Sequence, residues 1–356
     1  MRKYLLPEKG KFYKANLHGH TTFSDGALTP EEVKAEYKKR GYSINAFSDH
    51  EILWNHYEKL KDDEFLPIVA TELAVADLKD PFPIRSTVHL NVFARDPKEE
   101  GTPFKCKRNI DWLLDEKYIT EEMVKTRSWN GIIDDIGEQY AANVNKIIKT
   151  CNEKGYIVCL NHPTWSLLNK GEYLDYEGLW GVEVYNHGCF NITGDTNDER
   201  VFEDILRSGR NIFPLCTDDS HFKGSAKIGK PNCDGFGGWV MVKAEALEYD
   251  KVFEALEKGD FYCSTGPEIY ELYYEDGKIH IECSEAREII MNCLTRCGER
   301  YAENGKSVTS AEFKLNPEIH GFVRFKVIDN SGRVAYTRAF YVDELLEGAT
   351  RRRALF

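Results

Sequence analysis

The chain has 356 residues, and its 59 acidic side chains outnumber its 47 basic ones, giving a net charge of −12. This acidic balance, without a basic stripe interleaved with aromatic residues, argues against nucleic acid as a partner. No apolar run approaches the roughly 20 residues of a membrane span, and the first residues lack the apolar core of a secretion signal, so no membrane partner is expected.

The ten cysteines include no Cys-x-x-Cys pair, which is typical of reduced thiols in a cytoplasm. We therefore expect a cytoplasmic protein. Because nucleic acid and membranes are disfavoured as partners, we expect a small-molecule substrate. The length allows a barrel of roughly 250 residues together with a smaller unit. The sequence gives no indication of the oligomeric state.

The first informative segment is residues 16–26, NLHGHTTFSDG, which follows a short strand-like start. In an extended segment the side chains of His18 and His20 point to the same side, so both imidazoles can reach one ion. The polar turn that follows can bring the carboxylate of Asp25 toward the same cavity. Imidazole nitrogens and carboxylate oxygens are common metal ligands, so this segment predicts a metal site.

A helix is predicted directly after this motif. Thr29 is its N-cap, Pro30 its first residue, Glu32 completes a capping box and Gly41 ends it. Further helices are predicted at about residues 142–154, 198–208 and 250–258, each followed by a glycine. Short apolar runs lie between these helices. Such alternation of strand and helix favours a parallel sheet.

Potential metal ligands recur where the apolar runs stop. The residues concerned are His50, Glu72, His89, His162, His187, Asp219 and His221. In a parallel barrel the carboxyl ends of the strands meet at one rim, which carries the active site. We therefore expect these side chains to gather around one cavity.

Two regions depart from the alternation. Residues 96–140 are charged and predicted to be mainly helical, as an insertion that either acts as a lid or caps the barrel. After Tyr262, short strands are predicted at residues 269–274, 279–283, 322–327 and 334–342, with hairpin turns at 275–277 and 330–332. We expect a barrel domain at residues 1–262 and a small antiparallel β-sandwich domain at residues 263–356.

The ordered motifs are His-x-His, Ser-Asp-Gly, Ser-Asp-His, a lone Glu, a lone His, Asn-His-Pro and Asp-x-His. With this set, residues 14–265 resemble the PHP (polymerase and histidinol phosphatase) family of metal-dependent phosphoesterases. Within that family the chain looks most like the two-domain group that includes the CehA/McbA-type hydrolases, and residues 263–268, CSTGPE, extend the resemblance toward the C-terminus. The resemblance implies an α/β fold with a distorted (β/α)7 barrel.

The resemblance also implies a ligand set for up to three divalent ions. Carried over by position, the first ion is held by His18, His20, Glu72 and Asp219, the second by Glu72, His89 and His162, and the third by Asp25, His50 and His221. Some family members have a histidine where this chain has Asp25. Imidazole and carboxylate ligands without a thiolate suit zinc, manganese or iron, and leave the choice among them open.

This site predicts hydrolysis of a phosphate ester by a metal-bridging hydroxide in a di- or trinuclear centre. A bound metal can lower the pKa of water to about 7, and a second ion can stabilise the leaving oxygen. We expect Glu72, Asp219 and His221 to have catalytic roles. Asp49 and Asp218, which directly precede predicted ligands, are expected to orient imidazoles by hydrogen bonds.

Four residues are candidates for contacting the substrate. They are Arg85, His187, Lys223 and Lys227. The two lysines lie in the loop just after His221, where a phosphate group would need a cation. Trp165, three residues after His162, can form a wall of the cleft.

Three alternatives remain open. A carboxylic or carbamate ester hydrolase of the CehA/McbA type would use the same ligands, and a neutral pocket would favour it, whereas dependence on Arg85 or Lys223 would favour phosphate. A non-catalytic metal or nucleotide-binding module is disfavoured, because structural zinc sites are usually closed and often rich in thiolates. A polymerase-associated nuclease, the third alternative, is disfavoured by the acidic charge.

Overall fold

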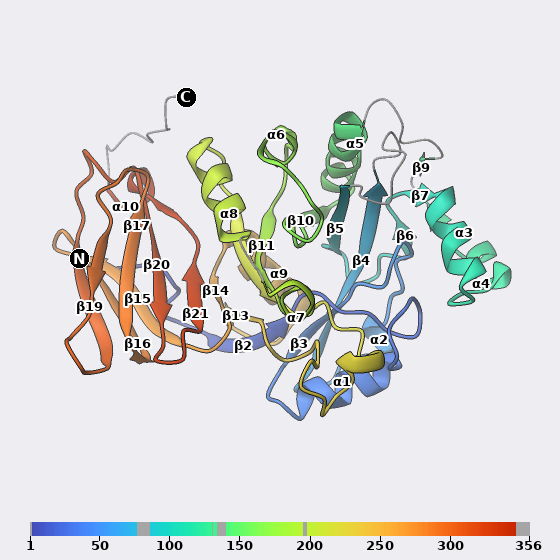
Figure 1. Ribbon diagram of the computed structural model, residues 1–356, viewed down its shortest axis with the longest axis horizontal. Coiled ribbons are helices and arrows are strands. Elements are labelled where there is room, and N and C mark those ends of the chain that lie inside the picture. Colours follow the sequence, from blue (N-terminus) through green and yellow to red (C-terminus); the bar gives the residue numbers. More distant parts are fainter. Residues whose placement is uncertain (1, 77–85, 130, 134–139, 195–197, 347–356) are drawn as a thin grey trace.

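The computed structural model describes residues 2–76, 86–129, 131–133, 140–194 and 198–346. A large sheet flanked by helices adjoins a region made mainly of antiparallel strands (Figure 1). The strands of the large sheet that precede residue 265 are β2 (Lys11–Asn16), β3 (Ile44–Phe47), β4 (Leu66–Ala76), β5 (Thr87–Ala94), β10 (Tyr156–Leu160), β11 (Gly181–Asn186), β12 (Phe213–Thr217), β13 (Trp239–Ala244) and β14 (Phe261–Ser264). Their spatial order is β12-β11-β10-β5-β4-β3-β2-β13-β14.

This sheet is mixed, so the expectation of a parallel sheet is only partly met. The pairs β2–β3, β3–β4, β10–β11 and β11–β12 are parallel, whereas β5 runs antiparallel to both β4 and β10. The strands β4 and β5 follow each other in the chain and pair directly. An antiparallel neighbour does not need the crossover helix that two parallel strands require.

The two ends of the strand order β12 to β14 approach each other. The Sγ atoms of Cys216 in β12 and Cys263 in β14 are 3.1 Å apart. At the rim, an isolated parallel bridge between Gly19 and Ser220 joins the segments that follow β2 and β12. These contacts place the first and last predicted ligand motifs side by side. A closed (β/α)7 barrel stays a prediction.

The predicted helices are present. The helices of this region are α1 (Pro30–Lys38), α2 (Tyr57–Leu60), α5 (Tyr140–Glu153), α6 (Lys170–Asp175), α7 (His187–Thr193), α8 (Asp198–Arg207) and α9 (Tyr249–Lys258), with a 3₁₀ turn η1 (Gly224–Ala226). The capping box of α1 forms as expected, because the Thr29 and Glu32 side chains each accept a hydrogen bond from the other residue's backbone N–H. No described helix is long and apolar enough to cross a membrane.

The insertion combines short helices with short strands. Its elements are β6 (Gly101–Thr102), β7 (Lys105–Cys106), α3 (Lys107–Asp115), α4 (Glu121–Lys125), β8 (Ser128–Trp129) and β9 (Ile132–Ile133). Ile110 and Leu113 of α3 are buried in a small core with Ile52 and Trp54, which follow β3. The insertion therefore packs onto the segment that carries His50.

The C-terminal region contains two antiparallel layers around a separate apolar core. One layer consists of β1 (Lys3–Tyr4), β15 (Ile269–Glu275), β16 (Lys278–Ala286) and β19 (Val308–Lys314). The other consists of β17 (Glu288–Cys293), β18 (Glu299–Tyr301), β20 (Phe322–Ile328), β21 (Val334–Thr337) and β22 (Phe340–Tyr341), followed by α10 (Val342–Leu345). At the β15–β16 turn both Asp276 and Gly277 have positive φ, 49° and 83°, as a tight hairpin requires.

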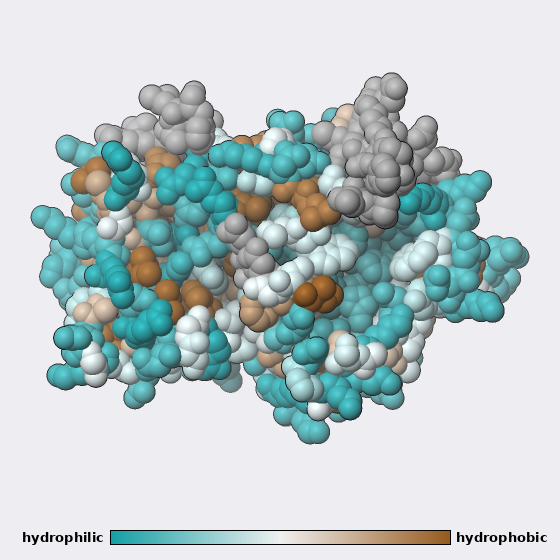
Figure 2. All heavy atoms as spheres, viewed as in Figure 1, coloured by the Kyte–Doolittle hydropathy of each residue, from teal (hydrophilic) through white to brown (hydrophobic). Residues whose placement is uncertain are grey.

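Two features connect this region to the large sheet. The strand β21 pairs with β14, so one hydrogen-bonded sheet continues from the helix-flanked region into the C-terminal region. The N-terminal strand β1 pairs with β15. The division of the chain at residue 262 stays a prediction. The face in Figure 2 is mainly hydrophilic, and its apolar residues form small separate patches.

Candidate metal centre

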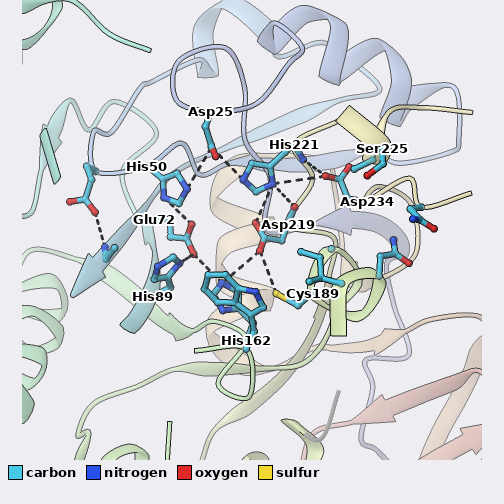
Figure 3. Close-up of a pocket in the computed structure, with 18 of the residues that line it drawn as sticks. Asp25, His50, Glu72, His89, His162, Cys189, Asp219, His221, Ser225 and Asp234 are labelled. Carbon is cyan, nitrogen blue, oxygen red and sulfur yellow. Dashed lines mark hydrogen bonds and ion pairs between the residues drawn. The ribbon is translucent and has the colours of Figure 1, made fainter. Parts of the chain in front are cut away.

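Most of the predicted ligands line one cavity (Figure 3), and His18 and His20 contact two of these wall residues, Glu72 and Asp219. His18 and His20 follow β2, Glu72 and His89 lie in β4 and β5, and His162 follows β10. His50 pairs with Glu72 through a backbone bridge, and the Asp219 N–H donates to the His18 carbonyl at 3.0 Å. These backbone bonds fix the spacing of the ligands independently of their side chains.

The first set of potential ligands consists of His18, His20, Glu72 and Asp219. His18 Nε2 is 3.3 Å from Glu72 Oε1 and 3.2 Å from Asp219 Oδ1. His20 Nε2 is 3.3 Å from Glu72 Oε2 and 3.0 Å from Asp219 Oδ1. Metal bonds of 2.0–2.1 Å in a tetrahedron place neighbouring ligand atoms about 3.3 Å apart. The spacing therefore fits a divalent ion.

An unpartnered buried atom supports this fit. His18 is fully buried and its Nε2 has no hydrogen-bond partner. Its other nitrogen, Nδ1, lies 2.7 Å from Glu183 Oε1. A hydrogen bond from Nδ1 to a carboxylate leaves Nε2 with a free lone pair, as in metal-binding histidines. A metal ion would satisfy this nitrogen, which is otherwise costly to bury.

The second set consists of Glu72, His89 and His162. His89 Nδ1 is 3.0 Å, and His162 Nε2 3.5 Å, from Glu72 Oε1. Glu72 belongs to both sets and is 1% exposed, so its carboxylate can bridge two ions. His162 has a φ of 26° and Asp219 a φ of 55°. Left-handed backbone at non-glycine residues is costly and is concentrated at functional sites.

The third set consists of Asp25, His50 and His221, with His20 nearby. Asp25 Oδ1 is 3.3 Å from His221 Nε2 and 3.6 Å from His50 Nε2, and this buried oxygen has no hydrogen-bond partner. The His20 ring stacks on those of His50 and His221, with centroids 4.3 and 4.2 Å apart. The structure therefore brings together the side chains of each set named from the family resemblance, and their role as metal ligands stays a prediction.

The charges of the site are strongly coupled. Burial alone would raise the pKa of Glu72, but His18, His89 and His50 outweigh it and hold that pKa well below its usual range. Burial and the neighbouring His20 lower the pKa of His50 to about 3, which keeps this imidazole in its neutral, metal-binding form. Metal binding competes with protons for such groups.

His20 shows the opposite balance. Burial disfavours its charged form, but Asp219 and Glu72 raise the pKa of His20 to about 10. Without a metal, the carboxylates therefore hold a proton on this imidazole. A divalent ion would replace that proton and supply the positive charge that the carboxylates attract.

Glu183 is a buried part of this site that the sequence motifs do not include. Its Oε1 accepts a hydrogen bond from Thr217 Oγ1 at 2.6 Å, besides its contact with His18, and its Oε2 accepts from the His162 backbone N–H at 2.8 Å. Glu183 thus positions two predicted ligands. In the sequence, Glu183 is a single carboxylate inside the segment Gly181–Asn186. Successive side chains of a strand point to opposite faces, so Glu183 faces away from its apolar neighbours Val182 and Val184.

The expectation that Asp49 and Asp218 hydrogen-bond the imidazoles is wrong. Asp49 accepts from the backbone N–H and hydroxyl of Thr21 at 2.7 and 2.8 Å, and from Ser24 Oγ at 2.7 Å. Asp218 accepts from three consecutive backbone N–H groups, at residues 236–238, and from the Tyr37 hydroxyl. Backbone N–H groups and hydroxyls of neighbouring segments are the hydrogen-bond partners of these carboxylates, so both aspartates fix loops of the site.

The cavity at the metal ligands has a volume of about 460 Å³. Apart from the predicted ligands, its walls are formed by Glu51, Ala74, Asn109, Trp112, Trp165, Gly188, Cys189, Asn191, Ile192, Ser225, Ala226, Asn232 and Asp234. Trp112 and Trp165 are 40% and 41% exposed. Trp112 belongs to α3, so the insertion reaches the cavity, and Trp165 lies against the rings of His89 and His162.

The predicted substrate contacts are not brought together at this cavity. Lys223, Lys227 and His187 are absent from its described walls. Lys223 Nζ donates to the Tyr118 hydroxyl at 2.9 Å, and His187 Nδ1 lies 2.8 Å from the Tyr185 hydroxyl. Arg85 lies outside the described residues. Among the described wall residues there is no lysine or arginine.

No family model and no curated protein matches this sequence. Solved structures show remote similarity. A two-domain protein from Bacteroides vulgatus, containing a predicted PHP-like metal-dependent phosphoesterase, has 14% identity, with 95% of this chain and 98% of that chain covered and a TM-score of 0.43.

Two further structures are similar to this chain. A proposed metal-dependent phosphoesterase from Bifidobacterium adolescentis has 19% identity, with 71% of this chain and 98% of that chain covered and a TM-score of 0.41. The lesion-specific endonuclease PfuEndoQ from Pyrococcus furiosus has 14% identity, with 82% of this chain and 64% of that chain covered and a TM-score of 0.37. Because these likenesses are remote, the assignment of function rests on the geometry of the cluster of imidazoles and carboxylates, which fits metal-dependent hydrolysis.

Proposed function

We propose that this protein is a metal-dependent hydrolase that cleaves a phosphate ester at a di- or trinuclear centre of the PHP type. The observation that carries the proposal is the convergence of three ligand sets on one cavity, two of which contain a buried atom without a hydrogen-bond partner. Two or three zinc, manganese or iron ions are the proposed cofactors. A cytoplasmic location and a small-molecule substrate remain part of the proposal.

Bound ions would polarise the ester and lower the pKa of an attacking water to about 7. The residues of the chain fix where this can happen. Glu72 contributes to two ligand sets, and Asp219 and His221 lie at the cavity wall. His221 Nδ1 lies 2.9 Å from the Asp219 backbone carbonyl, which places its proton on Nδ1 and leaves Nε2 facing Asp25.

The charge balance supports an anionic substrate. Three divalent ions would bring six positive charges to a site whose proposed carboxylate ligands are Asp25, Glu72 and Asp219. The loaded cavity would be electropositive although the chain carries a net charge of −12. Phosphate oxygens bind directly to such ions, so the ester needs no lysine or arginine clamp.

A second candidate is hydrolysis of a carboxylic or carbamate ester, as in the CehA/McbA type. The observation that favours it is the lack of lysine and arginine among the described cavity walls, together with the apolar faces of Trp112 and Trp165. The same ligands would serve both reactions. The two candidates therefore differ in substrate preference alone.

The test is a substrate panel assayed with metal-reconstituted protein. It includes phosphomonoesters, phosphodiesters, single-stranded DNA, carboxylic esters and carbamates with the same leaving group. We expect metal-dependent turnover of a phosphate ester that chelation abolishes and added metal restores. Turnover of carboxylic or carbamate esters alone would move the protein to the second candidate. Absence of metal-dependent turnover across the panel would contradict both.

A further inference from the structure

A cysteine lies inside the ligand cluster. Cys189 is 6% exposed and lines the cavity, and its Sγ is 3.9 Å from Asp219 Oδ2 (Figure 3). Ligand atoms of His162, Cys189 and Asp219 all lie within 4.8 Å of one another. The sequence motifs include no thiolate ligand, although His187 stands two residues before Cys189.

The backbone holds Cys189 in this place. The Asn186 side chain caps α7 by accepting a hydrogen bond from the Cys189 backbone N–H at 2.9 Å, and its Nδ2 donates to Glu183 Oε2 at 2.9 Å. The same Glu183 oxygen accepts from the His162 backbone N–H. One carboxylate therefore fixes both Cys189 and His162. The Gly188 N–H also donates to the Asp218 carbonyl at 2.8 Å, which anchors the first turn of α7 beside Asp219.

The Asp219 carboxylate faces potential ligands on two sides. Its Oδ1 lies 3.2 Å from His18 Nε2, the fully buried nitrogen without a hydrogen-bond partner. Its Oδ2 lies 3.6 Å from His162 Nε2 and 3.9 Å from Cys189 Sγ. Ligand atoms around a zinc ion with a sulfur ligand are about 3.5 Å apart, so the second side also approaches the spacing of a metal site.

We propose that Cys189 is a thiolate ligand of an ion that His162 and Asp219 also bind. The proposal rests on the metal centre of the proposed function and deepens it. Binding forms a metal–sulfur bond, breaks the S–H bond and releases the proton to solvent. His162 then belongs to two alternative ligand sets, one with Glu72 and His89 and one with Cys189 and Asp219.

The two sets differ in chemical softness. Thiolate sulfur favours zinc and cobalt, whereas carboxylate oxygen suits manganese. We therefore expect a soft ion to engage Cys189 and manganese to remain with Glu72 and His89. The competing explanation is that Cys189 only donates an S–H hydrogen bond to Asp219 Oδ2.

Cobalt(II) separates these explanations, because a thiolate bound to cobalt gives a charge-transfer absorption band in the near ultraviolet that oxygen and nitrogen ligands do not give. We expect this band in the cobalt-loaded full chain, its loss in Cys189→Ser, and its retention in Cys297→Ser, the matched control at an exposed cysteine. Cobalt content is measured on each sample. Wild-type protein that binds cobalt without the band would overturn the thiolate ligand and leave the metal centre intact.

A second readout does not depend on a folded variant. Cys189 in wild-type protein is alkylated with and without metal and quantified by peptide mass spectrometry. A bound thiolate reacts more slowly, so we expect cobalt to slow the alkylation of Cys189 about tenfold or more, and manganese to slow it less. Equal rates with and without cobalt would overturn the proposal. Failure to bind cobalt, zinc or manganese at all would instead overturn the proposed function.

Discussion

Two buried groups of charged residues in this molecule are built in different ways. In the metal centre, Glu72 and Asp219 face imidazoles, and His18 Nε2 and Asp25 Oδ1 have no hydrogen-bond partner. Between the C-terminal region and α8, the 1% exposed Arg324 donates from Nε to Glu203 at 2.5 Å and from Nη2 to Glu199 at 2.7 Å. Lys326 adds a contact to Glu199 at 2.9 Å.

The difference separates a binding site from a structural contact. The Arg324 cluster pairs its opposite charges within the protein, although Arg324 Nη1 has no hydrogen-bond partner. The metal centre leaves acceptor atoms facing one another around a cavity. Buried carboxylates and imidazoles in such an arrangement need an external cation, whereas a paired cluster contributes to the association of two regions. Substitutions in the two clusters should therefore have separable effects.

The largest effect is expected from Glu72→Gln. This change removes the carboxylate shared by two ligand sets while keeping the side-chain volume. We expect a loss of turnover of at least about 10²–10³-fold and a loss of bound metal, measured by steady-state kinetics and elemental analysis. Glu58→Gln, at an exposed position, is the control. A variant that kept wild-type turnover would contradict the assignment.

Arg324→Gln tests the other cluster. It leaves Glu199 and Glu203 without their main partner, and removing one member of a buried ion pair costs about 3–5 kcal/mol. We expect a lower free energy of unfolding in urea with unchanged metal content per folded molecule. Arg333→Gln, whose side chain is 58% exposed in its ion pair with Asp329, should have a much smaller effect. Loss of metal in folded Arg324→Gln protein would remove the distinction between the clusters.

Glu183→Gln should weaken the metal centre without removing a proposed ligand. The change reduces the hydrogen bonding that holds His18 and His162, and such supporting partners are typically worth 10–100-fold in metal affinity. Competition with a chromophoric chelator measures the affinity. The exposed Glu177→Gln variant should match the wild type. Equal affinities for both variants would show that Glu183 has no orienting role.

The stability of the metal-free protein should depend on pH with opposite signs at two imidazoles. The pKa of His20 is raised from 6.5 to about 10, so its contribution is fully present below pH 6.5 and is lost as the pH rises toward 10. The pKa of His50 is lowered to about 3, so its contribution is present above pH 6.5 and is lost as the pH falls toward 3.

Thermal unfolding across this pH range measures the effect. Bound metal should reduce the loss of stability between pH 6.5 and 10, because the ion replaces the proton on His20. A metal-free protein whose stability increased steadily from pH 6.5 to 10 would contradict the proposed balance at His20.

The smallest effects are expected from Trp112→Ala and Trp165→Ala. Both side chains line the cavity and neither belongs to a proposed ligand set. Each change should raise KM a few-fold and leave kcat nearly unchanged, because stacking contributes about 1 kcal/mol to substrate binding. Leu167→Ala, at a 56% exposed position outside the cavity walls, is the control. A lower kcat at unchanged KM would instead indicate that the tryptophans support the metal ligands.

The side chains that gather in the cluster of imidazoles and carboxylates were easier to predict from the sequence than their surroundings. His18, His20 and His162 stand at the ends of apolar runs, so pattern and spacing expose them. Glu183 and Cys189 lack that signal, because one lies inside a strand and the other depends on how α7 packs against the end of β12. The antiparallel course of β5 also has no local signature, since it depends on pairing with both β4 and β10.

Counting the bound metal ions is the decisive test of the proposed metal centre. Wild-type protein and Glu72→Gln are dialysed against zinc, manganese and iron(II) in turn, and the ions per chain are measured by elemental analysis after removal of free metal. We expect two or three ions per wild-type chain for at least one metal, and fewer for Glu72→Gln. Fewer than one ion per folded wild-type chain for all three metals would contradict the proposed metal centre.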